Sequence, residues 1–187
     1  MLRKIGMGAG LAYYVYKTYR RLQGVVKEPG VGDILCCDLL GDLMEHSGIY
    51  VGKCSIVELC SNGEVCQTTP QGFLNKASYK GIYVLSRCAK TGEKNSKGEE
   101  YVQIIGGLEY VAKRALESVG KRLDYRITAG LERYNCHKFV CDCLLEGAIK
   151  GKEWRLKDIK KTLYEIMQQK HQLKESDLGF YEWDIQI

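Results

Sequence analysis

The sequence predicts an α+β domain in which a central antiparallel sheet is flanked by helices. Short apolar runs bounded by Gly and Asn turn residues fill much of residues 33–88, and such runs are typical of strands. Apolar residues at helical spacing recur within 108–119, 136–144 and 152–174. The 187 residues, 45% of them hydrophobic, are enough for one globular domain with a buried core.

The strand candidates precede the helices along the chain. They are residues 33–37, 48–53, 55–60, 63–68 and 81–88. A single short turn separates 48–53 from 55–60, so these two segments are predicted to form a hairpin. Residues 89–100 show no apolar period and are predicted to be a solvated loop.

Three apolar stripes predict the helices. The stripes consist of Leu108, Val111, Ala112, Ala115 and Val119; then Cys136, Phe139, Val140, Cys143 and Leu144; then Leu156, Ile159, Leu163, Ile166 and Leu173. The third stripe alternates steps of three and four, as in a coiled coil. It is short for one, so we expect this helix to pack on the domain.

The basic charge of the chain is concentrated at its N-terminus. Residues 1–27 contain six basic residues and no acid, whereas the remainder carries 22 basic and 23 acidic residues, a net charge of −1. A near-neutral remainder argues against a broad nucleic-acid-binding face, and no nucleic-acid partner is expected. The turn-forming residues 28–32 mark the end of this basic N-terminal arm.

The arm has the pattern of an amphipathic helix. Its apolar residues recur at helical spacing, and its basic residues Lys4, Lys17, Arg20 and Arg21 cluster toward the two ends. Such a helix can lie on an anionic membrane surface, which makes these four residues candidates for membrane contact. The alternative is that the arm docks on its own domain. The uncharged run at 5–16 is too short to span a bilayer, and no good cleavage site for a signal peptide follows it.

Nine cysteines are present, an odd number without any Cys-x-x-Cys pair. A secreted disulfide framework and a zinc ribbon are therefore both disfavoured, and no metal site is expected. Free thiols are typical of the reducing cytosol, so we expect a cytoplasmic protein, peripheral to a membrane if the arm binds one.

A nucleophilic cysteine needs a histidine base, and the chain has only three histidines. His171 lies in a polar stretch, and His137 directly follows Cys136, so on a helix the two side chains would not face each other. His46 remains, at the start of the predicted hairpin.

Cys136 opens an apolar helix, and Asn135 before it suits the N-cap position. Free N–H groups at a helix start favour a thiolate and can hold an oxyanion, which makes Asn135 a capping and oxyanion-site candidate. Glu58 is a carboxylate inside a predicted strand, twelve residues after His46 and across the turn from it. Cys136, His46 and Glu58 thus form a candidate catalytic triad.

Two sequence boxes carry a resemblance to a known family. HSGIYVGKCSIVEL resembles the His box of the lecithin retinol acyltransferase-like families, which include the H-Ras-like suppressor phospholipases and acyltransferases, and RYNCHKFVCDCLLEG resembles their Asn-Cys box. These families are circularly permuted members of the NlpC/P60 papain-like superfamily, in which His precedes Cys along the chain. The sequence departs from the lipid acyltransferases at Glu58, where they carry His, and at residues 137–138, where Glu-His is usual.

The resemblance implies a permuted NlpC/P60 fold over residues 28–150, between the arm at 1–27 and a C-terminal helix and tail at 151–187. It also implies that Cys136 is the nucleophile, His46 the general base and acid, and Glu58 the third polar residue. The expected activity is transfer or hydrolysis of acyl groups on lipid esters, without a cofactor. The alternatives are a cysteine peptidase or amidase of NlpC/P60 type, and a catalytically silent protein that binds a membrane or a partner. The sequence does not decide the oligomeric state.

Overall fold

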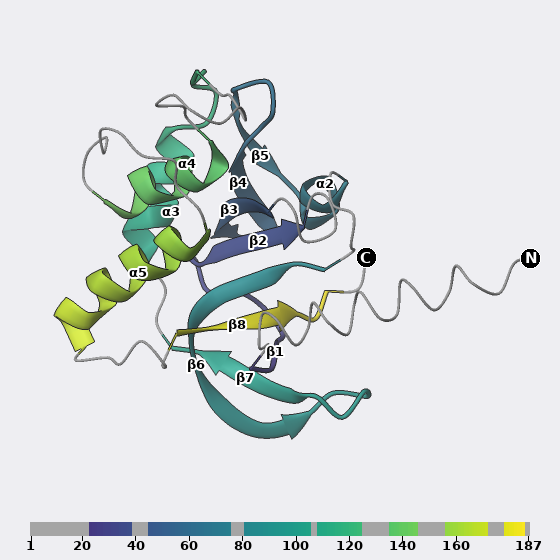
Figure 1. The fold of residues 1–187 in the computed structure, drawn as a ribbon. Coiled ribbons are helices and arrows are strands. Elements are labelled where there is room, and N and C mark those ends of the chain that lie inside the picture. The colour runs from purple at the N-terminus through teal and green to yellow at the C-terminus, as the bar shows by residue number, and fades with distance from the viewer. Residues whose placement is uncertain are drawn as a thin grey trace, which may run out of the picture.

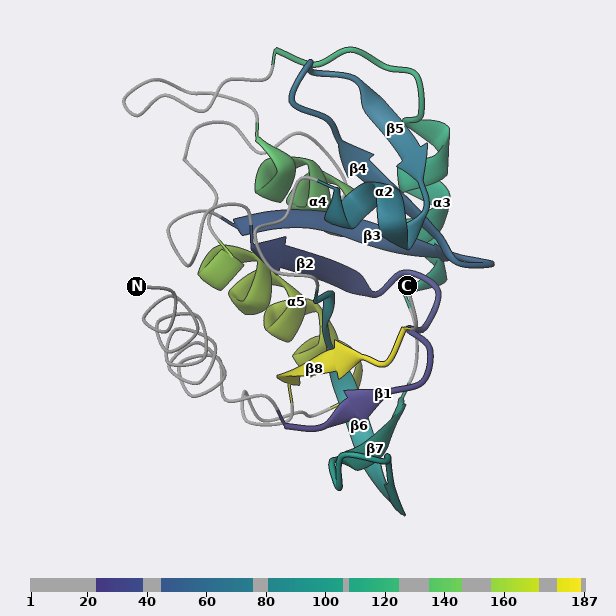
Figure 2. The same ribbon diagram turned by 90° about the vertical axis from the view of Figure 1, so that its right-hand side faces the viewer.

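The computed structural model describes residues 23–38, 45–75, 81–105, 108–124, 135–145, 156–171 and 178–185. These residues form eight strands and four helices (Figures 1 and 2). The strands are β1 (Val25–Val26), β2 (Ile34–Asp38), β3 (Glu45–Gly52), β4 (Ser55–Leu59), β5 (Val65–Thr68), β6 (Tyr83–Lys94), β7 (Glu100–Ile104) and β8 (Leu178–Trp183). The helices are α2 (Pro70–Leu74), α3 (Glu109–Glu117), α4 (Cys136–Leu144) and α5 (Leu156–His171).

The α+β class is confirmed, but the prediction of an antiparallel sheet is wrong in part. All eight strands join one mixed sheet in the order β5-β4-β3-β2-β6-β7-β1-β8. Its parallel pairings come from β1, which runs parallel to both β7 and β8. Because β8 also pairs with β6, the strands β6, β7, β1 and β8 form a closed ring of pairings.

The ring draws on segments far apart in the sequence. Val25 of β1 lies in register with Tyr101 of β7 and with Glu182 of β8, so a strand inside the basic 1–27 segment joins the sheet. The indole N–H of Trp183 donates to the carbonyl of Lys27 at 3.1 Å. Both β1 and β8 belong to the sheet although they lie outside residues 28–150.

The predicted loop at 89–100 is wrong. Strand β6 continues through Lys94, and β7 begins at Glu100, with Ala89 opposite Gln103 and Lys90 opposite Val102. The outer end of this hairpin is solvent-exposed, so its residues lack the apolar alternation by which a half-buried strand is recognised. The turn is closed by the side chain of Asn95, which accepts the N–H groups of Lys97 and Glu99.

Both faces of the central strands are buried. In β2, Ile34 and Cys36 face one apolar cluster and Leu35 and Cys37 face the other, which explains why the strand is almost wholly apolar. Helices α3, α4 and α5 lie together on one side of the sheet, and α2 lies on the opposite side (Figure 1). Strand β3 is therefore held between α3 and α4 on one side and Phe73 of α2 on the other.

The predicted hairpin is confirmed. Strands β3 and β4 pair antiparallel, with Gly48 opposite Glu58 and Tyr50 opposite Ile56. Lys53 and Cys54 at the turn both have positive φ, as a tight hairpin turn between twisted strands requires.

Within the described residues, no helix is long and apolar enough to cross a membrane.

Replacing Trp183 by Ala tests whether β8 belongs to the core. Trp183 is buried and packs edge-on against Tyr50, with ring centroids 5.4 Å apart. We expect Trp183→Ala to lower the free energy of unfolding by about 3–5 kcal/mol in urea titrations. Leu116→Ala, at an exposed apolar residue, is the control and should change it by less than about 1 kcal/mol. Equal effects of the two substitutions would contradict this packing.

Candidate active site

Cys136 stands at the first residue of α4, next to the edge of β3. The N-cap residue Asn135 has an extended backbone, and its side-chain oxygen accepts the Lys138 N–H at 2.8 Å. The Asn135 carbonyl accepts the N–H of Phe139, the first bond of the helix ladder. Helix geometry leaves the N–H groups of Cys136 and His137 without an acceptor inside the helix. These two donors and the positive end of the helix dipole favour negative charge at this point.

The edge of β3 receives the sulfur of Cys136. Tyr50 directs its N–H toward Asp33 on the β2 side, so residues an odd number of positions away, Glu45 and Ser47, direct theirs to the other edge. There the pairing with β4 ends at Gly48 and Glu58. Cys136 occupies the place beyond that end: its Sγ lies 4.0 Å from the carbonyl oxygen of Glu45 and also accepts the N–H of Ser47.

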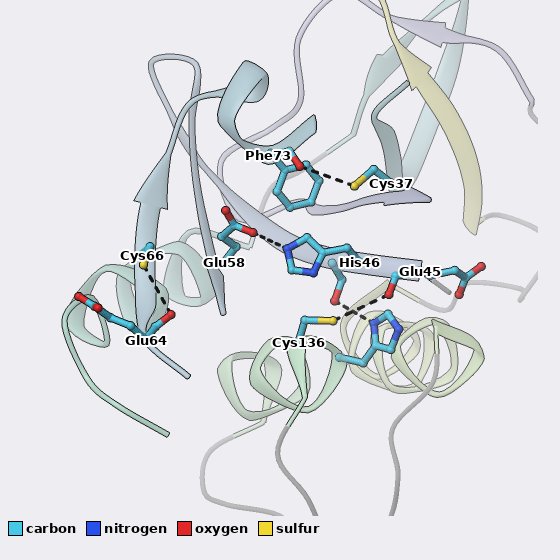
Figure 3. Close-up of polar contacts among 10 residues, drawn as sticks. Cys37, Glu45, His46, Glu58, Glu64, Cys66, Phe73 and Cys136 are labelled. Atoms are coloured by element: carbon cyan, nitrogen blue, oxygen red, sulfur yellow. Dashed lines mark hydrogen bonds and ion pairs between the residues drawn. The ribbon is translucent and has the colours of Figure 1, made fainter. Parts of the chain in front are cut away.

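His46 joins the cysteine to the carboxylate (Figure 3). Its Nε2 forms a hydrogen-bonded ion pair with Glu58 Oε2, so Nδ1 is the ring nitrogen left for the Cys136 thiol, with which the ring is also hydrogen-bonded. The exposed fractions are 5% for Cys136, 4% for His46 and 2% for Glu58, so the three groups interact with little screening by water. The structure thus brings the three predicted residues together.

Strand geometry explains why a glycine lies between the members of this pair. Gly48 is the cross-strand partner of Glu58, and His46 lies two residues before it on the same face. A Cβ on Gly48 would come within 3.0 Å of Phe73 Cε2 and 2.9 Å of Ile56 Cγ2. The missing side chain lets Glu58 reach diagonally to His46 and lets Phe73 pack on the imidazole, with ring centroids 5.0 Å apart.

The two titrating groups favour an ion pair. Burial would raise the pKa of Cys136, but the hydrogen bond and charge of His46, with the N–H and hydroxyl of Ser47, outweigh burial and lower it. Burial would lower the pKa of His46, but the hydrogen bonds and charges of Cys136 and Glu58 outweigh burial and raise it. Between the lowered thiol pKa and the raised imidazole pKa, the site holds a thiolate and an imidazolium.

The other cysteines lie in different surroundings. All nine are free. Burial raises the pKa of Cys88 and of Cys143 to about 12, and it also raises the pKa of Cys37, the β2 partner of His46. These thiols are held in the protonated form, which is unreactive toward electrophiles.

Not every predicted residue falls within the part of the chain that the structure describes. Lys4, Lys17, Arg20 and Arg21 lie outside the described residues. Two other polar residues that follow Glu58 have partners away from His46: Asn62 accepts the N–H of Glu64, and Gln67 donates to Ser55. In the parts of the chain that the structure describes, no group of three or more His, Cys, Asp or Glu side chains could hold a metal ion.

Sequence reasoning missed the two residues that flank the triad. Ser47 Oγ lies 2.9 Å from His137 Nδ1, on the side of β3 that faces α4, and Phe73 covers His46 from α2. Ser47 is a polar residue at a core-facing strand position, and this pattern in the sequence could have identified it as part of the site. Nothing in the local sequence of Phe73 points to His46.

Gly48→Ala should disturb the His46–Glu58 pair. Because the added Cβ meets Phe73, Ile56 and the Val57 carbonyl, we expect a loss of about 1–3 kcal/mol in the free energy of unfolding and slower alkylation of Cys136. Gly30→Ala is a matched control, since its Cβ meets Ile104 and Asp33 away from the triad. It should lower stability without slowing alkylation. If both variants slow alkylation equally, Gly48 has no specific effect on the site.

Glu58→Gln should raise the apparent thiol pKa of Cys136. The substitution keeps size and hydrogen bonding but removes the charge that stabilises the imidazolium, and through it the thiolate. We expect the midpoint of the alkylation rate against pH to rise by about one unit. Iodoacetamide labelling resolved by peptide mass spectrometry measures it for Cys136 alone. Coincident curves for wild type and variant would show that Glu58 does not act on the thiol.

Comparison with known proteins yields no assignment: no protein-family model matches the chain, and no curated protein matches its sequence.

Proposed function

We propose that this protein is an enzyme that transfers or hydrolyses acyl groups through a thioester on Cys136. One observation carries the proposal: a buried thiol at a helix start is hydrogen-bonded to an imidazole, which is itself paired with a carboxylate. This is the arrangement that activates a cysteine nucleophile. A structural role would not need three ionisable side chains buried together, because burying charge is costly.

In the proposed first half-reaction, His46 Nδ1 already holds the proton of Cys136, and the Cys136 thiolate attacks the carbonyl carbon of the substrate. The negative charge that develops on the carbonyl oxygen is stabilised by the N–H groups of Cys136 and His137. His46 then gives its proton to the leaving oxygen or nitrogen as that bond breaks, which leaves the acyl group on sulfur. Glu58 stabilises the imidazolium and orients the ring through Nε2.

In the second half-reaction, water or an acceptor alcohol or amine gives its proton to His46 and attacks the thioester carbonyl. The carbon–sulfur bond breaks, the sulfur leaves as thiolate, and the thiolate–imidazolium pair is restored. Hydrolysis and transfer differ only in this acceptor. The same triad can therefore perform both.

Lipid esters are the proposed substrate class. The support is the resemblance to the lecithin retinol acyltransferase-like families of the permuted NlpC/P60 superfamily, together with the six basic residues of 1–27. Such residues would concentrate the enzyme on an anionic membrane beside its substrate, where each contributes about 1 kcal/mol. We accordingly propose a permuted NlpC/P60 fold and a cytoplasmic location at a membrane surface.

A peptidase or amidase of NlpC/P60 type is the second candidate. The observation in its favour is Glu58, a carboxylate at the position where the lipid acyltransferases have His. A peptidase or amidase would use the same nucleophile and base and would not need the basic arm. An ester panel and a peptide panel separate the two.

Incubation with phosphatidylcholine–phosphatidylserine vesicles should leave an acyl group on Cys136. We expect intact-mass spectrometry to show a fatty-acyl adduct that maps to Cys136 and is released by hydroxylamine, as a thioester is. Cys136→Ser should lose the turnover and the thioester while keeping its unfolding midpoint, since the change is nearly isosteric. Cleavage of peptides with no acyl adduct would favour the second candidate. No reaction with either panel would contradict both.

A further inference from the structure

A second hydrogen-bonded chain, formed by His137 and Ser47, reaches Cys136 from the side of β3 opposite to His46. Neighbouring strand residues face opposite sides of a sheet, so His46 lies toward Phe73 and Ser47 lies toward α4. Ser47 is fully buried, and His137 is 8% exposed. Ser47 Oγ lies 2.9 Å from His137 Nδ1.

The direction of these hydrogen bonds follows from counting protons. Ser47 has one hydroxyl proton. A thiolate can only accept, so in its hydrogen bond with the Cys136 thiolate the Ser47 hydroxyl is the donor, and Ser47 Oγ then accepts from His137 Nδ1–H. The N–H of Ser47 also points to the sulfur. The chain therefore runs from His137 through Ser47 to Cys136, with every donor directed toward the thiolate.

A different neighbour suits the protonated thiol. The Glu45 carbonyl oxygen, 4.0 Å from Sγ, is an acceptor and can receive the thiol S–H. The Glu45 carbonyl thus favours the protonated thiol, whereas the donors of Ser47 favour the thiolate. Both residues belong to β3. Among the described residues, the titratable groups that act on the sulfur from other elements are His46, with Glu58 behind it, and the Cys37 thiol of β2.

We propose that Ser47 and His137 are positioning residues for the Cys136 thiolate. The N–H and the hydroxyl of Ser47 hold the thiolate as a fixed pair of donors, independently of the proton carried by His46, and His137 orients the hydroxyl. The inference rests on the proposed function and deepens it. During turnover His46 gives up and regains a proton, whereas a serine hydroxyl keeps its proton at neutral pH. The donors of Ser47 therefore stabilise negative charge on the sulfur whenever it is present, including when the thiolate leaves the thioester.

Four variants test the roles of Ser47 and His137 through the pH dependence of Cys136 alkylation, which needs no substrate. Ser47→Ala removes the hydroxyl donor, and we expect the midpoint to rise by about one pH unit. His137→Phe removes the donor behind Ser47 and should raise the midpoint by a smaller amount. His137→Asn should retain the wild-type midpoint, because the Asn amide nitrogen can take the place of Nδ1. Ser86→Ala is the matched control, since Ser86 is a buried serine bonded to Asp33 away from the site, and it should leave the midpoint unchanged.

The double variant Ser47→Ala/His137→Phe shows whether His137 acts through Ser47. We expect its midpoint to equal that of Ser47→Ala. An additive shift, or a Ser47→Ala midpoint equal to that of wild type, would overturn the inference. The proposed function has a separate test within the same data. An ordinary thiol midpoint for wild-type Cys136 would contradict the function itself, whereas a lowered midpoint that Ser47→Ala leaves in place would overturn this inference alone.

Discussion

The contact between the start of α4 and the open edge of β3 is the constraint on which the site depends. Strand β4 stops pairing with β3 at Gly48, so the backbone of Glu45 and Ser47 faces Cys136 instead of another strand. Cys136 is also the first residue of α4, so the positive end of the helix dipole lies at the sulfur. The proposed nucleophile and the donors to its thiolate are thus fixed by one junction between a helix and a sheet, both anchored in buried apolar clusters.

The proposed base, His46, is positioned by the other face of the same strand. His46 and Glu58 lie on neighbouring strands at a diagonal, and Gly48 and Phe73 shape the space around the imidazole. Because His46 and Ser47 are consecutive residues on opposite faces, one strand supplies both the group that exchanges a proton and the group that does not. Strand β3 lies between helices α3 and α4 and helix α2, so this arrangement is held rigidly from both sides.

Strong local signals made part of this structure predictable. The hairpin over β3 and β4 follows from apolar runs around a short turn, and the triad follows from three scarce features: few histidines, a cysteine after an N-cap Asn, and a carboxylate inside a strand. Strand β1 has two residues, and the outer part of β6 is exposed, so neither has an apolar period to recognise. The parallel pairings of β1, and the roles of Phe73 and Ser47, depend on contacts between distant segments. Local sequence does not encode these.

We propose that Cys136 and His46 exist as a thiolate–imidazolium pair at neutral pH. Nitrogen-15 NMR of the His46 ring, with Cys136→Ser as the reference, measures its protonation directly. Both ring nitrogens of His46 should stay protonated through neutral pH in the wild type, and the imidazole pKa should fall when Cys136 is replaced. A His46 ring that loses its proton near its ordinary pKa of about 6.5, identically in both proteins, would contradict it.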